Sequence, residues 1–267
     1  MLTISHVSKT FAPGTANEHL ALDDISLHLA PGEFVTVIGS NGAGKSTLMN
    51  AVSGSFIVDK GRITLGGQDI TFVKEHKRAR IVGRLFQDPM KGTAPHMTLE
   101  ENLALAYSRG KRRRFRRAVN AKDIAVFREA LARFGMGLED RMKTKVGLLS
   151  GGQRQAVTLL MCTIVPPRVL LLDEHTAALD PAAAEKVLAI TREIVSREKL
   201  TTLMITHNIQ SALSMGTRTI MMNAGRIVLD IAGEERAHMT VPRLLELYQQ
   251  KSGAALDTDR ILLTQTQ

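Results

Sequence analysis

The chain alternates between short apolar runs and segments with helical spacing, a pattern that predicts a mixed α/β fold. Residues 34–38 form a continuous run that ends at Gly39, as expected for a strand covered on both faces. Residues 25–29 alternate with a period of two, which is typical of a strand with one buried face. Helices are predicted at about 45–53 and 241–249. Further strands are predicted at 2–7, 62–65, 169–172, 201–205, 218–222 and 226–231.

The pattern changes between about residues 89 and 154, where strand signals give way to helical ones. Residues 99–107 and 123–134 have the spacing of apolar residues that an amphipathic helix shows. Strands that alternate with helices favour a parallel sheet. We therefore expect a mostly parallel α/β core, interrupted by a helical insert at about 89–154 and followed by a polar tail at 251–267.

Composition is that of an ordinary globular protein. The chain has 267 residues, of which 44% are apolar and 23% charged, enough to bury a full core. No apolar run approaches the ~18 residues of a membrane span, and residues 1–6 lack the pattern of a secretory signal. A single cysteine, Cys162, excludes an internal disulfide and an all-cysteine metal site. Because it lies in an apolar run, we expect a buried, inert thiol.

The formal net charge of +9 comes mostly from one segment. Residues 109–117 supply seven positive charges, which leaves about +2 for the rest of the chain. Three interpretations of this cluster stay open: a solvated surface, a contact with anionic lipid headgroups, or a nucleic-acid patch. Only Phe115 interrupts the run, which is poor support for base stacking.

A glycine-rich loop of the P-loop type follows the strand at 34–38 and opens the helix at 45–53. Its glycines allow backbone amides to approach phosphate oxygens, and the helix N-terminus adds a positive dipole end. Lys45 can reach the β- and γ-phosphates of a nucleotide, and the Ser46 hydroxyl suits Mg²⁺. The predicted phosphate-binding residues are Gly39, Ser40, Asn41, Gly42, Ala43, Gly44, Lys45, Ser46 and Thr47.

Two carboxylates follow the apolar strand at 169–172, at the end of the strand where α/β sheets bind ligands. Asp173 is placed to hold Mg²⁺ and its water shell. Glu174 is one residue further along and projects differently, so it is placed to polarise the water that attacks the γ-phosphate. Beside a P-loop, this pair predicts ATP hydrolysis with Mg²⁺.

Residues 149–153 match the signature sequence of the ABC ATPases, which the chain resembles over about residues 1–250. The resemblance implies one ABC ATP-binding domain: a P-loop NTPase core with an N-terminal antiparallel β-subdomain and the inserted α-helical subdomain. It also implies that the signature faces the nucleotide held by a second copy of the chain, so that two ATP molecules join a head-to-tail dimer. The signature residues are Leu149, Ser150, Gly151, Gly152 and Gln153.

The same resemblance assigns roles to four further positions. Gln87 corresponds to the loop glutamine that touches Mg²⁺ and links the core to the helical insert. Asp180 belongs to the loop that crosses the dimer interface. His207 corresponds to the switch histidine that contacts the γ-phosphate and orients Glu174. Phe11 matches the aromatic residue that stacks on adenine, with core packing as the alternative.

Three residues depart from the family pattern. His175 stands where proline usually follows the glutamate, Ala178 replaces a common serine, and Phe11 replaces a more usual tyrosine or tryptophan. None of them removes a group that hydrolysis needs. An imidazole beside Glu174 raises the hypothesis that His175 tunes activity with pH.

The resemblance implies an ATP-hydrolysing motor subunit, peripheral on the cytoplasmic face of the cell membrane. Its partners would be a second copy, a separate permease and an extracytoplasmic substrate-binding protein. Residues 173–180 and 221–230 resemble a bacterial uptake subgroup, linked in part to tryptophan-like or other amino acids.

The alternatives are a soluble ABC ATPase that acts on nucleic acid or the ribosome, and a regulatory or defence ATPase without a permease. The first is disfavoured because only 104 positions separate Ser46 from Ser150 and the chain holds one ATPase unit, so no nucleic-acid partner is expected.

Overall fold

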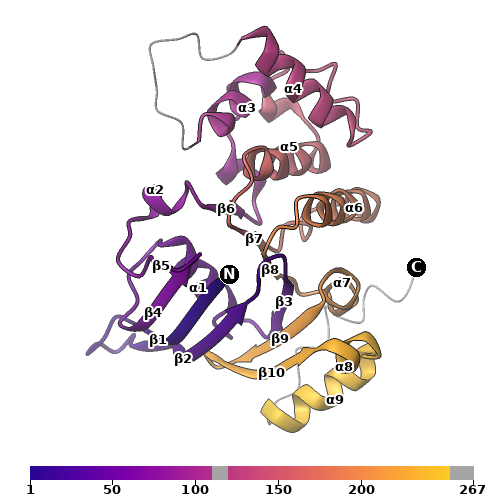
Figure 1. The fold of residues 1–267 in the computed structure, drawn as a ribbon. Coiled ribbons are helices and arrows are strands. Elements are labelled where there is room, and N and C mark those ends of the chain that lie inside the picture. Colours follow the sequence, from indigo (N-terminus) through magenta and orange to yellow (C-terminus); the bar gives the residue numbers. More distant parts are fainter. Residues whose placement is uncertain (110–119, 253–267) are drawn as a thin grey trace.

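The computed structural model describes residues 1–109 and 120–252, which form two sheets and a separate helical part (Figure 1). The N-terminal sheet has the strand order β2-β1-β4-β5, with antiparallel neighbours throughout. Its formation confirms the predicted N-terminal antiparallel subdomain. Its strands are β1 (Leu2–Phe11), β2 (His19–Leu29), β4 (Lys60–Leu65) and β5 (Gln68–Asp69).

The second sheet is the α/β core, and its strand order is β10-β9-β3-β8-β7-β6. Five neighbouring strands run parallel, and only β10 is antiparallel to its neighbour β9. This arrangement confirms the predicted mostly parallel core. The strands are β3 (Phe34–Gly39), β6 (Val82–Leu85), β7 (Val169–Asp173), β8 (Thr202–Ile205), β9 (Arg218–Asn223) and β10 (Arg226–Ala232).

Helices α3, α4 and α5 form the part drawn at the top of Figure 1. Helix α5 continues through residue 154, the expected end of the insert, and packs against β6 of the core. No helix in the described ranges has the length and apolar character needed to cross a bilayer. The helices are α1 (Lys45–Ser53), α2 (Glu75–Arg78), α3 (Leu99–Tyr107), α4 (Ala121–Ala132), α5 (Gly151–Thr163), α6 (Pro181–Arg197), α7 (Ile209–Met215), α8 (Gly233–Ala237) and α9 (Val241–Ser252), with 3₁₀ turns at Pro89–Gly92 and Val146–Leu148.

Strand β3 lies at the centre of the core, because its side chains reach three hydrophobic clusters. Val35 and Val37 belong to a cluster with the antiparallel sheet and α1, whereas Phe34 packs with residues of the helical part. Ile38 joins a third cluster with β9, β10, α7 and α9. All six residues of β3 are buried, as expected for a strand covered on both faces.

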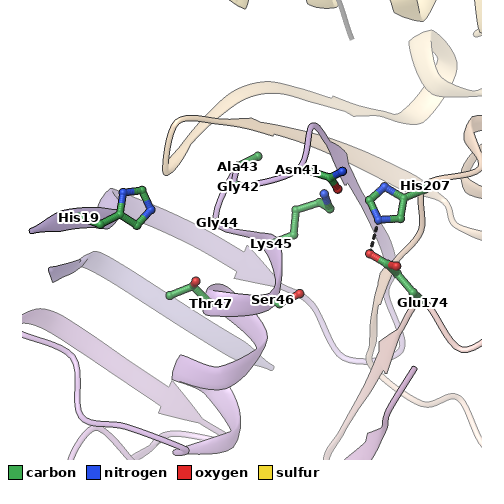
Figure 2. Close-up of a pocket in the computed structure, with 10 residues that line it drawn as sticks. All are labelled: His19, Asn41, Gly42, Ala43, Gly44, Lys45, Ser46, Thr47, Glu174 and His207. Carbon is green, nitrogen blue, oxygen red and sulfur yellow. Dashed lines mark ion pairs between the residues drawn. The ribbon is translucent and has the colours of Figure 1, made fainter. Parts of the chain in front are cut away.

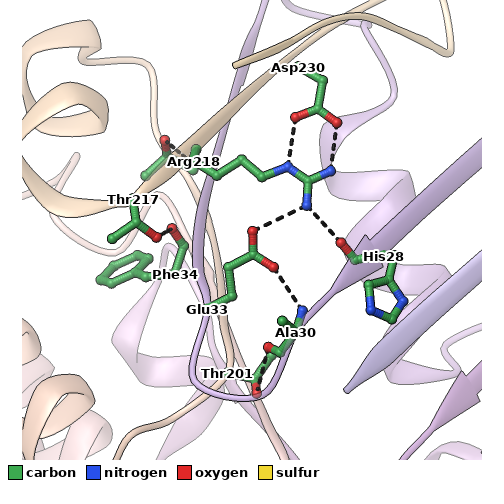
Figure 3. Close-up of polar contacts among 9 residues, drawn as sticks. His28, Ala30, Glu33, Phe34, Thr201, Thr217, Arg218 and Asp230 are labelled. Carbon is green, nitrogen blue, oxygen red and sulfur yellow. Dashed lines mark hydrogen bonds and ion pairs between the residues drawn. The ribbon is translucent and has the colours of Figure 1, made fainter. Parts of the chain in front are cut away.

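Arg218 at the start of β9 connects the two sheets (Figure 3). Its Nε and Nη2 donate to the two carboxylate oxygens of Asp230 in β10, at 2.7 and 2.6 Å. Its Nη1 donates to the His28 carbonyl at the end of β2 (2.8 Å) and to Glu33 (3.2 Å). These hydrogen bonds raise the pKa of Arg218 above its usual value. One side chain therefore fixes the antiparallel sheet against the core sheet.

Most of the basic cluster, residues 110–117, and the tail from residue 253 lie outside the described residues. Arg109 is described, and its Nη2 donates to the carbonyls of Cys162 (2.9 Å) and Val165, beyond the end of α5. The half-buried Arg109 side chain therefore binds carbonyls at the C-terminal end of α5. The Cys162 thiol is buried and donates to the Arg84 carbonyl (3.1 Å), and burial raises its pKa to about 11. This setting confirms that the thiol is buried, as expected.

Candidate nucleotide-binding site

The loop between β3 and α1 has a backbone that only glycine accommodates. Gly44 has φ 96°, and a Cβ atom there would lie 2.5 Å from the Ala21 carbonyl oxygen. At Gly39, with φ 154°, a Cβ atom would lie 2.3 Å from the Met222 carbonyl oxygen. Helix α1 starts directly after the loop, at Lys45. Loop and helix N-terminus thus form the amide-lined cradle for an anion that the sequence predicts.

Lys45 points into this loop and is only 5% exposed. Its Nζ donates to the carbonyls of Gly39 (2.7 Å) and Ser40 (2.9 Å). Burial lowers the pKa of Lys45, and the nearby carboxylates of Glu174 and Asp173 partly oppose that shift. The structure therefore brings the lysine of the loop near both carboxylates.

Glu174 and His207 follow neighbouring parallel strands, β7 and β8. The Glu174 amide donates to the Ile205 carbonyl (3.0 Å), which continues the ladder between these strands. Glu174 Oε1 lies 2.5 Å from His207 Nε2 (Figure 2). The two side chains line one pocket together with the loop. The lining residues are His19, Asn41, Gly42, Ala43, Gly44, Lys45, Ser46, Thr47, Glu174 and His207.

Oxygen donors suited to Mg²⁺ lie around the same place. Ser46 is exposed in the first turn of α1, and the Asp173 carboxylate ends β7 with its side chain 13% exposed. Burial raises the pKa of Asp173, whereas Arg84 lowers it. Carboxylate and hydroxyl oxygens are the hard ligands that Mg²⁺ takes, so these two groups fit the ion. Gln87 is exposed in the bend after β6.

The signature begins helix α5, in the helical part of the molecule and away from α1 (Figure 1). The Ser150 hydroxyl accepts from the Gln153 amide (3.3 Å), and Gln153 Oε1 accepts from the Ser150 amide (3.2 Å). Gly152 allows α5 to approach α6, since a Cβ atom there would lie 2.9 Å from Ala183 Cβ. Within the described residues, the pocket lining includes none of 149–153. A single chain thus leaves signature and P-loop apart.

Comparison with known proteins assigns the chain to a family. The sequence pattern of the family described as "ABC transporter" matches residues 22–177. The chain belongs to the ABC transporter family. The ABC chain is 43% identical to a tyrosine transport ATP-binding protein of Clostridioides difficile (strain R20291), over 93% of this chain and 99% of that protein.

Two further comparisons agree. The ABC chain is 34% identical to the thiamine import ATP-binding protein ThiQ of Shigella boydii serotype 4, over 82% of this chain and 88% of that protein. A solved dimeric structure of a bacterial ABC transporter cassette matches with a TM-score of 0.75 and 25% identity, over 87% of this chain and 98% of the cassette. The ABC chain is therefore an ATP-hydrolysing motor subunit of a transporter, as the sequence predicts.

Several predicted site residues of this ABC chain fall outside the pocket lining, namely Gly39, Ser40, Gln87, Asp173, Phe11, Asp180 and the signature residues. Asp180 caps helix α6, where its carboxylate accepts from the Ala183 amide (2.9 Å). Phe11 is 39% exposed and meets Phe56 edge to face, with ring centroids 5.4 Å apart. Their roles at the nucleotide, and that of Gln87, stay predictions.

His19 lines the pocket, and sequence reasoning missed it. It is paired with Phe11 across β1 and β2, on the side of the pocket opposite His207 (Figure 2). Its signal in the sequence was weak, because it is one exposed polar residue at the start of β2, after a stretch of exposed residues. Only the pairing of β1 with β2 brings it to the loop.

The structure argues against the hypothesis that His175 tunes activity with pH. His175 is 3% exposed, and its Nε2 lies 3.2 Å from the Thr191 hydroxyl of α6. Burial lowers its pKa to about 4. The ring therefore stays neutral near neutral pH and serves the packing of α6, not the pocket.

Proposed function

We propose that two copies of this ABC ATPase close head to tail around two ATP molecules with Mg²⁺ and thereby drive import of a small solute through a separate permease. The observation that carries the proposal is the divided site: the pocket holds the P-loop, Glu174 and His207 but no signature residue. The backbone amides of the signature lie at the start of helix α5, on another part of the chain, where Gly151 is the first helical residue. A second copy supplies them to the first.

Within each composite site the chain's own groups divide the work. Amides of residues 41–47 bind the phosphates, and Lys45 leaves the Gly39 carbonyl to neutralise their charge. Glu174 accepts a hydrogen bond from the attacking water, and His207, 2.5 Å from Glu174, holds that carboxylate in position. Ser46 and Asp173 would hold Mg²⁺, which would supply positive charge to neutralise the phosphates.

The relatives narrow the class of solute and partners. The relative with 43% identity is named a tyrosine transport protein, which supports import of an amino acid. We infer membrane permease subunits as partners, docked at the helical part, and an extracytoplasmic substrate-binding protein. The chain is then a peripheral protein on the cytoplasmic face of the membrane. Transport names among the relatives do not favour the nucleic-acid alternative.

Replacing the proposed base tests the mechanism. Glu174→Gln removes the charge that polarises water but leaves the phosphate cradle intact. Turnover should fall by roughly 10²–10⁴-fold, ATP binding should persist, and an ATP-dependent dimer should accumulate in light-scattering measurements. Unchanged turnover would refute the assigned base. A variant that stays a single copy in saturating Mg-ATP, alone and with its permease, would refute the composite site.

A further inference from the structure

Arg84 in β6 lies against Asp173, the carboxylate proposed to hold Mg²⁺. Its Nη2 is 3.4 Å from Asp173 Oδ2. Both side chains are shielded, since Arg84 is 12% exposed and Asp173 13%. Such shielding reduces screening by water and salt, so the charge of Arg84 acts strongly on this carboxylate.

Other contacts hold the Arg84 guanidinium in place without Asp173. Its Nη1 donates to the hydroxyls of Ser53 (3.0 Å) and Ser55 (3.4 Å), which lie at and after the end of α1. Its Cζ lies 4.7 Å from the centre of the Phe86 ring. The cation is therefore fixed from three sides, and its contact with Asp173 is long enough to be broken easily.

This arrangement is costly for the fold. Strand β6 is the edge of the core sheet, and its other residues are buried and apolar or glycine. Arg84 Nε is buried and has no hydrogen-bond partner among the described residues. An apolar side chain at this place would avoid that desolvation cost. We therefore look for the role of Arg84 in its positive charge next to Asp173.

We propose that Arg84 is the counter-cation of Asp173 in the metal-free protein and sets how strongly nucleotide binding depends on Mg²⁺. The inference rests on the proposed function. Without metal, Arg84 balances Asp173, so that the pocket stays less repulsive to phosphates. With metal, two cations share one carboxylate, which weakens metal binding. Arg84 is a positioning residue in this account, since it acts through Asp173.

The dependence of nucleotide binding on Mg²⁺ is measured with ADP, which binds without being hydrolysed. Calorimetric titration gives its dissociation constant in EDTA and in saturating Mg²⁺, and the quantity of interest is the ratio of the two. Arg84→Gln should raise this ratio roughly three- to tenfold, because metal-free ADP binds more weakly and metal-loaded ADP more tightly. Arg84→Lys keeps the charge and should stay within about twofold of the wild type.

A matched control separates this effect from the loss of any surface arginine. Arg62→Gln breaks the exposed pair with Asp69 in the antiparallel sheet and should leave the ratio unchanged. A double-mutant cycle supplies the second test: in an Asp173→Asn background, Arg84→Gln should no longer change the ratio. If Arg84→Gln does not fold, Arg84→Met, which keeps the apolar contact with Phe86, takes its place.

The outcomes separate this inference from the proposed function. If wild-type chain binds no ADP with or without Mg²⁺, the proposed function fails. If ADP binds but Arg84→Gln leaves the ratio unchanged, the role of Arg84 is wrong and the nucleotide site stands. An equal effect of Arg84→Gln with Asp173 present and absent also overturns the inference.

Discussion

Glu174 adopts a left-handed backbone conformation, with φ 47°. A non-glycine residue in that region carries strain of about 1–3 kcal/mol. The amide of Glu174 donates to the Ile205 carbonyl of β8 and its carboxylate contacts His207. These two contacts hold the residue in place at the C-terminal end of β7. The turn presents the carboxylate to the pocket (Figure 2). Contacts within the chain thus set the geometry of the proposed base.

His175, the next residue, gives a prediction about stability. Burial lowers its pKa from 6.5 to about 4, so the unfolded chain takes up this proton at a higher pH than the folded protein. The contribution of the neutral His175 ring to the unfolding free energy is fully present above pH 6.5 and is lost as the pH falls toward 4. It amounts to about 3 kcal/mol. His175→Gln should make the pH dependence of the unfolding free energy shallower by that order, measured by urea denaturation.

The control for His175→Gln is His76→Gln, which removes an exposed histidine from α2. The pH profile of ATP hydrolysis near neutral pH should be the same for wild type and His175→Gln, because the ring is already neutral there. An equally steep loss of stability in His175→Gln toward acid pH would show that the buried imidazole is not its source.

At the scale of elements, Arg236 connects the C-terminal helices to the helix after His207. It is 6% exposed, belongs to α8, and donates to the Thr219 hydroxyl of β9 (2.7 Å). Its Nη2 also donates to the carbonyls of Ala212, Leu213 and Gly216 at the end of α7, at 2.8–3.0 Å. A cation at these carbonyls stabilises the helix C-terminus. Helix α7 is thereby fixed at the end opposite His207.

Arg236→Met should therefore destabilise the protein by about 2–4 kcal/mol, because it leaves several carbonyls and a hydroxyl without their donor. Urea denaturation at neutral pH measures the change. Arg243→Met is the matched control: its Nη1 contacts Glu246 at 3.2 Å on an exposed face of α9, and its loss should cost less than about 1 kcal/mol. Equal effects of the two substitutions would contradict the role of Arg236.

Elements with strong local periodicity could be predicted from sequence. The helix expected at 45–53 is α1, with the same bounds, and the buried strand at 34–38 is β3. Strand β6 carried no such pattern, because its four residues include Gly83 and Arg84. Its position depends on pairing with β7, a contact between residues far apart in the chain.

The same distinction applies to the candidate site. Lys45 and the loop before it are contiguous in sequence, and the structure places them together as expected. Their meeting with Glu174 and His207 was expected from the family resemblance and from strand ends at one edge of the sheet. The contacts of His19 and Arg84 could not be predicted, since they depend on which strands pair and on side chains that cross between elements.

At the scale of the whole molecule, each chain carries both parts of the proposed composite site but keeps them apart. The pocket lies on the core beside α1, whereas the signature begins α5 in the helical part (Figure 1). Arg218 hydrogen-bonds both to β2 of the antiparallel sheet and to β10 of the core sheet that carries the pocket.

Complementation between two defective variants tests this division. Lys45→Ala removes the lysine proposed to bind the phosphates, and Ser150→Arg places a bulky side chain in the signature. Each variant alone should therefore be inactive. An equimolar mixture should recover roughly a quarter of wild-type ATPase activity, because about half of the dimers are mixed and each has one intact composite site.

The matched control mixes Lys45→Ala with Glu174→Gln. Both residues line the same pocket of one chain, so every site in these mixed dimers stays defective and no activity should return. Recovery in this control, or none in the first mixture when mixed dimers form, would contradict a site shared between copies.

The two hydrogen bonds of the Lys45 ammonium within its own loop have a consequence for which ligands the loop selects. The carbonyls of Gly39 and Ser40 accept from two of the three N–H donors of this ammonium. A ligand that replaces a carbonyl at this ammonium must offer a stronger acceptor, so weakly charged metabolites gain little by entering, whereas a polyphosphate offers more than it displaces. The contacts of Lys45 within its own loop therefore favour polyphosphates over weakly charged metabolites.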